Sequence, residues 1–123
     1  MKRPILRRNA PRPSILSHRR GGTIKAITMK FAAIIEYTPD KSKIAELRPP
    51  HREYLTGLRK DGKAAMAGPF TDDSGGLLIY EAQTKEEVEE MIKADPFGTG
   101  GVFVSWTIRP WNLLWVNFDL MPA

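Results

Sequence analysis

The stretch MKFAAIIEYTPD, residues 29–40, decides how the rest of the chain is interpreted. Residues 30–37 form a short apolar run rich in strand-forming types, which predicts a β-strand. The TPD that follows is a turn signal, and Asp40 is a residue type that caps the N-terminus of a helix. The chain from residue 29 onward is therefore predicted to open with a strand, a turn and a helix.

After the turn, the spacing of apolar residues changes to the period of a helix. The residues on this stripe are Ile44, Leu47, His51, Leu55 and Leu58. Pro49 and Pro50 fall inside the stripe and lack the backbone N–H that a helix interior uses. We therefore predict a short helical turn, a break at the prolines, and a second helix that has Pro50 in its first turn and ends near Gly62.

The remaining elements follow the same order of signals. A second helix stripe begins at a capping box, Thr84 with Glu87, and Pro96 ends it. The last strand alternates and is predicted to place Val102, Val104, Trp106 and Ile108 on one face. The strands predicted after the first one lie at 64–70, 77–82 and 102–111. The order predicts an α+β fold, a ferredoxin-like βαββαβ sandwich with both helices on one face of an antiparallel sheet.

The far face of such a sheet needs a cover. Side chains alternate across a strand, so the apolar residues of these strands cannot all face the helices. We predict a homodimer in which two sheets pack against each other. Large apolar residues of the C-terminal extension fit the same interface, namely Leu113, Leu114, Trp115, Val116 and Phe118.

Charge divides the chain into two parts. The 123 residues have a formal net charge of +5, yet residues 1–28 hold eight basic and no acidic residues, which leaves 11 basic and 14 acidic residues in 29–123. We expect 1–28 to be a basic, disordered leader, or Met29 to be the native start. The leader's prolines disfavour a transit-peptide helix, and its lack of aromatic residues disfavours a nucleic-acid-binding arm. We expect 29–123 to form one domain with a C-terminal extension.

Several classes of function are disfavoured by composition. The chain has no cysteine, which excludes thiol nucleophiles and disulfides. No apolar run approaches the ~18 residues of a membrane span, so we expect a soluble, cytoplasmic protein. One histidine among scattered carboxylates in the domain is no metal cluster, and the GTGG segment lacks the lysine of a phosphate-binding loop. We therefore expect no metal, no cofactor and no nucleic-acid partner.

Two polar residues lie on the predicted helical stripes. His51 is on the first stripe and Asp95 ends the second, so both are expected to point at the same sheet face and to meet in a cleft. At a helix N-terminus the dipole favours a neutral imidazole, whereas a nearby carboxylate favours the imidazolium. The pair suits a general base with an orienting acid. The alternative is structural, because a lone histidine on an apolar stripe is usually a residue at the edge of the core, and Asp before Pro often belongs to a turn.

The motifs resemble a known family. RPPHREYL (48–55), MAGPF (66–70), GGLLIYEA (75–82), KADPFGTGGVF (93–103) and IRPW (108–111) have the order and spacing of the YciI-like (YCII-related) domain. This resemblance covers roughly 29–111 and implies a ferredoxin-like fold that forms dimeric α/β barrels. It implies an active-site dyad at His51 and Asp95, with Gly68 and Pro69 in the same cleft. A family member that acts on a chlorinated muconolactone-type ring implies proton abstraction with loss of halide, without metal or coenzyme.

These observations lead to two hypotheses of function. The first is a small cofactor-independent enzyme, such as a lyase, dehalogenase or isomerase, that uses the dyad on a small organic acid or lactone. In it, Arg109 pairs with a substrate carboxylate and Tyr54, one helical turn from His51, donates to an oxyanion. A solvated Arg109 and a core role for Tyr54 are the open alternatives. The second hypothesis is a non-catalytic dimer that binds a small ligand or regulates.

Overall fold

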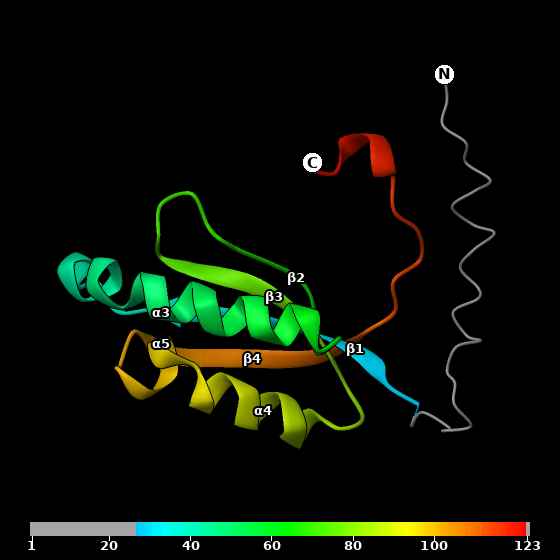
Figure 1. Ribbon diagram of the computed structural model, residues 1–123, viewed down its shortest axis with the longest axis horizontal. Helices are drawn as coiled ribbons and strands as arrows, with labels where there is room; N and C mark the ends of the chain where they lie inside the picture. Colours follow the sequence, from blue (N-terminus) through cyan, green and yellow to red (C-terminus); the bar gives the residue numbers. More distant parts are fainter. Residues whose placement is uncertain (1–26, 123) are drawn as a thin grey trace.

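The computed structural model describes residues 27–122, so most of the leader expected at 1–28 lies outside the described residues. Four antiparallel strands form one sheet in the order β2-β3-β1-β4 (Figure 1). The strands are β1 (Met29–Tyr37), β2 (Ala64–Pro69), β3 (Gly75–Ala82) and β4 (Phe103–Trp111). The helices are α3 (Lys41–Lys60), α4 (Lys85–Ala94) and the short α5 (Pro96–Thr99), followed near the C-terminus by the 3₁₀ turn η1 (Phe118–Leu120). This arrangement confirms the predicted α+β, ferredoxin-like fold.

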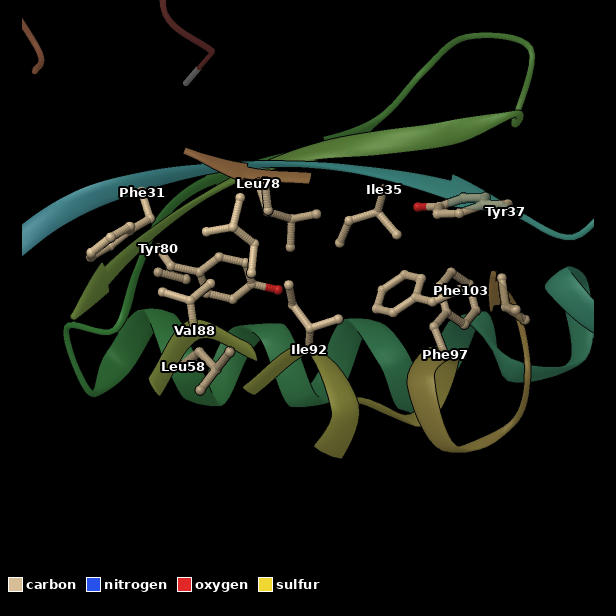
Figure 2. Close-up of a cluster of buried hydrophobic side chains, with 14 of the residues drawn as sticks. Phe31, Ile35, Tyr37, Leu58, Leu78, Tyr80, Val88, Ile92, Phe97 and Phe103 are labelled. Atoms are coloured by element: carbon tan, nitrogen blue, oxygen red, sulfur yellow. The ribbon is translucent and has the colours of Figure 1, made fainter. Parts of the chain in front are cut away.

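The helices cover one face of the sheet and bury a single core against it (Figure 2). In β1 the odd-numbered residues from Phe31 to Tyr37 are buried, as the alternation of a strand with one covered face requires. The core residues labelled in Figure 2 are Phe31, Ile35, Tyr37, Leu58, Leu78, Tyr80, Val88, Ile92, Phe97 and Phe103. This core fixes where α3 and α4 lie over the strands.

Helix α3 runs without a break through Pro49 and Pro50, so the predicted interruption is wrong. Each proline removes one hydrogen bond to the carbonyl four residues earlier, at Ala45 and Glu46. Both of those residues are exposed, so water can replace the lost donors. Burial of one continuous stripe outweighs the loss, because the buried face extends from before the prolines to Leu58. His51 therefore sits inside a helix, and the dipole of a helix N-terminus does not act on it.

The predicted caps are present. Asp40 accepts a hydrogen bond from the N–H of Lys43, which begins α3. Thr84 accepts from the N–H of Glu87, whose carboxylate accepts in turn from the N–H of Gln83, and together they begin α4. Helix α4 ends before Pro96 as predicted. The sequence did not predict the short α5 that begins at this same proline.

The predicted alternation of the last strand is wrong at Val104, whereas Val102 is buried as predicted. The register between β1 and β4 shifts between Glu36 and Tyr37, which places Phe103 opposite Tyr37. Phe103 is buried as a result, whereas Val104 is exposed. Trp106 and Ile108 do face the helices, as predicted. The shift brings Phe103 into the aromatic cluster described below.

The other face of the sheet carries apolar side chains without a cover in the described chain. Ile34 pairs with Leu77 on one side and with Thr107 on the other, and it is 52% exposed, with Leu77 42% exposed. Leu114 and Trp115 of the C-terminal segment are exposed as well. Within 27–122 no helix is both long and apolar enough to cross a membrane. The cytoplasmic location stays a prediction.

Candidate active site

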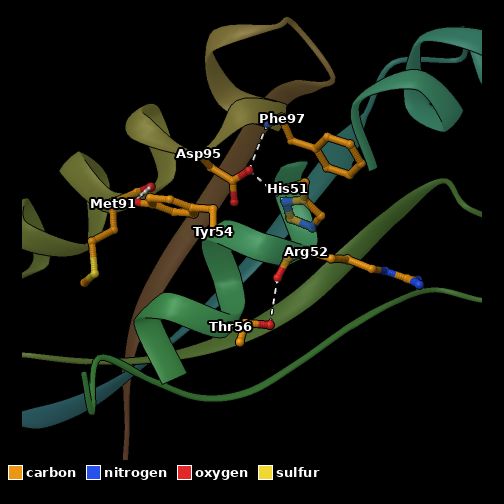
Figure 3. A network of polar contacts seen from close by, with 7 residues as sticks. All are labelled: His51, Arg52, Tyr54, Thr56, Met91, Asp95 and Phe97. Carbon is orange, nitrogen blue, oxygen red and sulfur yellow. Dashed lines mark hydrogen bonds and ion pairs between the residues drawn. The ribbon is translucent and has the colours of Figure 1, made fainter. Parts of the chain in front are cut away.

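The structure brings His51 and Asp95 together although 44 residues separate them in the chain (Figure 3). His51 Nδ1 lies 2.7 Å from Asp95 Oδ1. His51 is 6% exposed and Asp95 is fully buried. An ionised carboxylate can only accept, so when Asp95 is ionised Nδ1 donates to it, and Nε2 of a neutral imidazole then has the lone pair. Within 27–122 Nε2 makes no hydrogen bond.

Asp95 is held by the joint between two helices. It follows the last residue of α4 and caps the N-terminus of α5, where Oδ1 also accepts from the N–H of Phe97 at 2.8 Å. Pro96 occupies the first position of α5 without the loss of a helical hydrogen bond, because backbone N–H groups in the first turn of a helix have no carbonyl partner within that helix. One oxygen of Asp95 therefore serves both the helix and the histidine. Its other oxygen, Oδ2, is buried and has no hydrogen-bond partner in the described part of the chain.

Aromatic rings fix the plane of the imidazole. His51 stacks on Phe97 with ring centroids 3.8 Å apart and planes 5° apart, and Phe103 meets it edge-on at 5.9 Å. Tyr37 packs on the other two rings, edge-on against Phe97 and stacked on Phe103. Sequence reasoning missed these three aromatic residues. The DPF motif contained the signal for Phe97, because a residue two positions after a capping aspartate lies close to it.

A cavity of about 710 Å³ opens between α3 and β2. His51 lies in its wall, and Gly68 and Pro69 of β2 line it opposite α3, as the resemblance implied. Met121 and Pro122 of the C-terminal segment line it too. This volume lies within the range of sites that take small molecules, roughly 300–1,000 Å³.

The cavity wall is basic. Arg48, Arg52 and Arg59 of α3 all line it. Arg48 is paired with Asp73, at 2.9 Å, so its charge is balanced. Arg52 and Arg59 form no ion pair within residues 27–122 and keep their positive charge. The wall that holds His51 therefore attracts anions.

Two of the predicted site residues are not brought to the cavity. The Tyr54 hydroxyl donates to the backbone carbonyl of Met91 at 2.9 Å, and its ring packs against the core, which matches the structural alternative. Arg109 lies in β4 at the opposite edge of the sheet from β2, in register with Ala32. Because its neighbour Ile108 is buried under the helices, Arg109 points to the uncovered face. Neither residue lines the cavity.

Metal ligands do not gather in the described part of the chain. Within 27–122 no three His, Cys, Asp or Glu side chains lie close enough together to hold an ion. His51 lines the cavity, and its imidazole has one nitrogen paired with Asp95 and one without a hydrogen bond within 27–122. That arrangement is one in which a histidine can exchange a proton with a bound molecule.

The fold and the site define a small α+β protein with a buried His–Asp pair beside a basic cavity. Residues 29–112 match the YCII-related domain, and the chain belongs to that family. An uncharacterised protein of Bacillus subtilis, YjpA, is 38% identical over 63 residues, which are 51% of this chain and 73% of that protein.

One similar solved structure is that of an enzyme. The 5-chloro-2-hydroxyhydroquinone dehydrochlorinase TftG of Burkholderia phenoliruptrix, in complex with 2,5-dihydroxybenzoquinone, is 28% identical with a TM-score of 0.61. The match covers 68% of this chain and 94% of TftG. Rv0793 of Mycobacterium tuberculosis is 11% identical, with a TM-score of 0.46, over 73% of this chain and 98% of its own.

Proposed function

We propose that the protein is a small enzyme that needs no cofactor and removes a proton from a small organic acid or lactone, as a lyase, dehalogenase or isomerase does. The observation that supports this most is the buried pair itself, with Nδ1 of His51 2.7 Å from Asp95 Oδ1 in the wall of a cavity. The similarity to a dehydrochlorinase supports the same class of reaction.

The proposed step uses Nε2 of His51 as the base. Nε2 takes a proton from a substrate carbon next to a carbonyl group, and the electrons of the C–H bond move to the carbonyl oxygen. In a dehalogenase the halide then leaves with its bonding electrons, and in an isomerase the imidazolium returns the proton at another carbon. Asp95 keeps the tautomer and stabilises the charge that forms on the imidazole.

The acid group of the substrate is proposed to pair with Arg52. The sequence suggested Arg109 for this role, but Arg109 lies on the other face of the sheet, whereas Arg52 follows His51 in α3 and lines the cavity. A guanidinium binds a carboxylate through two parallel hydrogen bonds and so orients as well as attracts it.

The protein is also proposed to work as a homodimer. The exposed Ile34 and Leu77 support this, because they lie side by side on a sheet face with no cover in the described chain. Apolar surface of this kind is characteristic of an interface between subunits.

The proposed function is tested by assaying the full chain against lactones, halogenated organic acids and chlorinated hydroquinones. The readouts are halide release and the uptake of deuterium from D₂O, followed by NMR. We expect turnover by the native chain, and a loss of about 10²- to 10⁴-fold in kcat for His51→Asn, because a general base contributes about that much. Asp95→Asn is expected to lower kcat as well, since an amide does not stabilise the imidazolium.

The matched control is Asp61→Asn, which makes the same change at an exposed aspartate that ends α3. It should leave kcat unchanged. A second function, binding without turnover, predicts a different pattern. In that case no compound is turned over, and His51→Asn keeps most of the ligand affinity and the thermal stability of the native chain. That pattern would contradict the proposed enzyme.

A further inference from the structure

Tyr37, the last residue of β1, has a hydroxyl that the site described so far does not use. Tyr37 lines the same cavity as His51, and both rings pack against Phe97. The chain has three tyrosines, all of them within 27–122, and Tyr37 alone among them lines the cavity.

The other two tyrosine hydroxyls are placed differently. That of Tyr54 donates to the carbonyl of Met91. That of Tyr80 is sealed in the core, without a hydrogen-bond partner among the described residues. The Tyr37 hydroxyl makes no hydrogen bond within residues 27–122 and, unlike that of Tyr80, is not sealed off from the cavity. It is thus the tyrosine hydroxyl that remains able to donate to a bound molecule.

The ring that carries this hydroxyl is held in place on several sides. Phe97 meets it edge-on at 5.4 Å, and Phe103 stacks on it at 5.9 Å. A Cβ at position 76 would lie 2.9 Å from the hydroxyl oxygen, so Gly76 leaves it the room it occupies. Tyr37 is 6% exposed. A donor fixed in this way does not have to be ordered when a ligand binds.

The hydroxyl stays protonated at neutral pH. Burial raises the pKa of Tyr37 above its usual 10, and the positive charge of Arg48 opposes that rise only in part. A neutral phenol donates its hydrogen, whereas a phenolate would only accept. The electrostatics of the site thus favour a donor next to a basic wall, the combination that stabilises a developing negative charge.

We propose that Tyr37 is a catalytic residue whose hydroxyl donates a hydrogen bond to the enolate oxygen of the substrate. This inference rests on the proposed function. When Nε2 of His51 takes the proton from carbon, the C–H bond breaks and its electron pair moves to the carbonyl oxygen. The hydroxyl of Tyr37 keeps its own proton and shares it with that oxygen. Arg52 holds the acid group, so the substrate class is an enolisable small anion with a carbonyl and a second acidic oxygen.

A binding experiment tests this with 2,5-dihydroxybenzoquinone as the probe, because its acidic enol oxygens resemble an enolate. Titration calorimetry on the full chain gives the dissociation constant. Tyr37→Phe keeps the ring contacts and removes only the hydroxyl, and we expect it to weaken binding about tenfold or more, as loss of a hydrogen bond to a charged group does. Tyr54→Phe is the matched control and should bind as the native chain does, because that hydroxyl is bonded to Met91.

Kinetics on whichever compound the native chain turns over give a second readout. Tyr37→Phe should lower kcat by about 10²-fold while KM changes little, the pattern of a donor that acts mainly in the transition state. If the hydroxyl of Tyr37 had a purely structural role, Tyr37→Phe would lower thermal stability and leave kcat and KM of the folded protein unchanged. Unchanged probe affinity and kcat in Tyr37→Phe, or no binding of the probe by the native chain, would overturn the role of Tyr37. The proposed function fails separately, if His51→Asn retains full turnover.

Discussion

Asp95 shows how much a single residue can do in this chain. Its Oδ1 accepts from Phe97 N–H and pairs with His51 Nδ1, so the oxygen that begins α5 also orients the imidazole. The sequence predicted that the two residues meet, because both lay on stripes that face the same sheet. It did not predict the capping role, since a four-residue helix leaves no periodic pattern.

Residues of the cavity could be predicted only where a motif contained them. Gly68 and Pro69 were predicted on the resemblance and line the cavity. For Tyr54 the sequence left a donor role and a core role open, because helical spacing cannot reveal that its hydroxyl is already bonded to a carbonyl. Tyr37 was missed because an aromatic residue at the end of a strand looks like any core residue until its neighbours are known.

The alkaline pH dependence of stability is a prediction about Tyr80. Burial, and after it the negative charge of Asp95, raise the pKa of Tyr80 far above its usual 10. The protonated hydroxyl of Tyr80 contributes its full stability to the fold below pH 10, the usual pKa of tyrosine in an unfolded chain. Above that pH the unfolded chain loses this proton while the folded chain keeps it, so the contribution decreases as the pH rises. We therefore expect the free energy of unfolding to fall above pH 10, where the unfolded chain ionises first.

Chemical denaturation between pH 8 and 11 measures this slope. In Tyr80→Phe the slope should be shallower by about 1.4 kcal/mol per pH unit, the effect of one proton. The comparison at pH 8, where tyrosines stay protonated in both states, serves as the baseline for each protein. An identical slope in the variant would show that Tyr80 ionises as easily in the folded state as in the unfolded chain.

Caps and turns were the most predictable features of the elements. Asp40 and Thr84 cap α3 and α4 as predicted, because an N-cap depends on a few neighbouring residues. The prolines of α3 were misjudged, since the local rule that proline breaks a helix was outweighed by burial of Ile44 and His51 on one stripe. Local signals thus predict where an element begins better than they predict whether tertiary packing carries it on.

The prolines of α3 lead to a prediction about stability. Pro49 and Pro50 are both exposed, so replacing either one with alanine should remove little packing and restore a hydrogen bond. We expect Pro49→Ala and Pro50→Ala each to raise the free energy of unfolding by on the order of 1–2 kcal/mol, which is the cost of an interior proline less the entropy that proline removes from the unfolded chain. Urea denaturation measures the change.

Gly57→Ala is the reference variant for the effect of helix propensity on stability in α3. Gly57 lies in α3 and has no atom within 4 Å of where a Cβ would be, so alanine fits. It should add roughly 0.5–1 kcal/mol from helix propensity alone. A loss of stability in both proline variants, alongside a gain in Gly57→Ala, would mean that the prolines shape α3 in a way that the fold needs.

At the scale of the whole molecule, the fold class was predictable and its assembly stays a proposal. The order of strands and helices was enough to predict the sheet, because each element had its own periodicity. The uncovered sheet face followed from alternation, and Ile34 and Leu77 are exposed on it. The proposed cover of this face is a second molecule, and the contacts between two molecules cannot be derived from the structure of one chain.

The homodimer is tested by light scattering after size-exclusion chromatography. The native protein should have a mass of two chains of 13.9 kDa each. Leu77→Glu should raise the dissociation constant of the dimer more than tenfold, because the interface would then bury unpaired charges near its centre. Gln83→Glu introduces the same side chain at an exposed site between β3 and α4 and should leave the mass unchanged. A native chain that remains monomeric at every concentration would contradict the dimer.

The shared oxygen of Asp95 has a consequence for descent. A relative without the proposed reaction has no use for the imidazole as a base, yet it still needs the Asp95 carboxylate to begin α5 at Pro96. We therefore expect His51 to be substituted earlier in evolution than Asp95. A distant relative that keeps only Asp95 would then share the fold, whereas one that also keeps His51 would share the proposed chemistry.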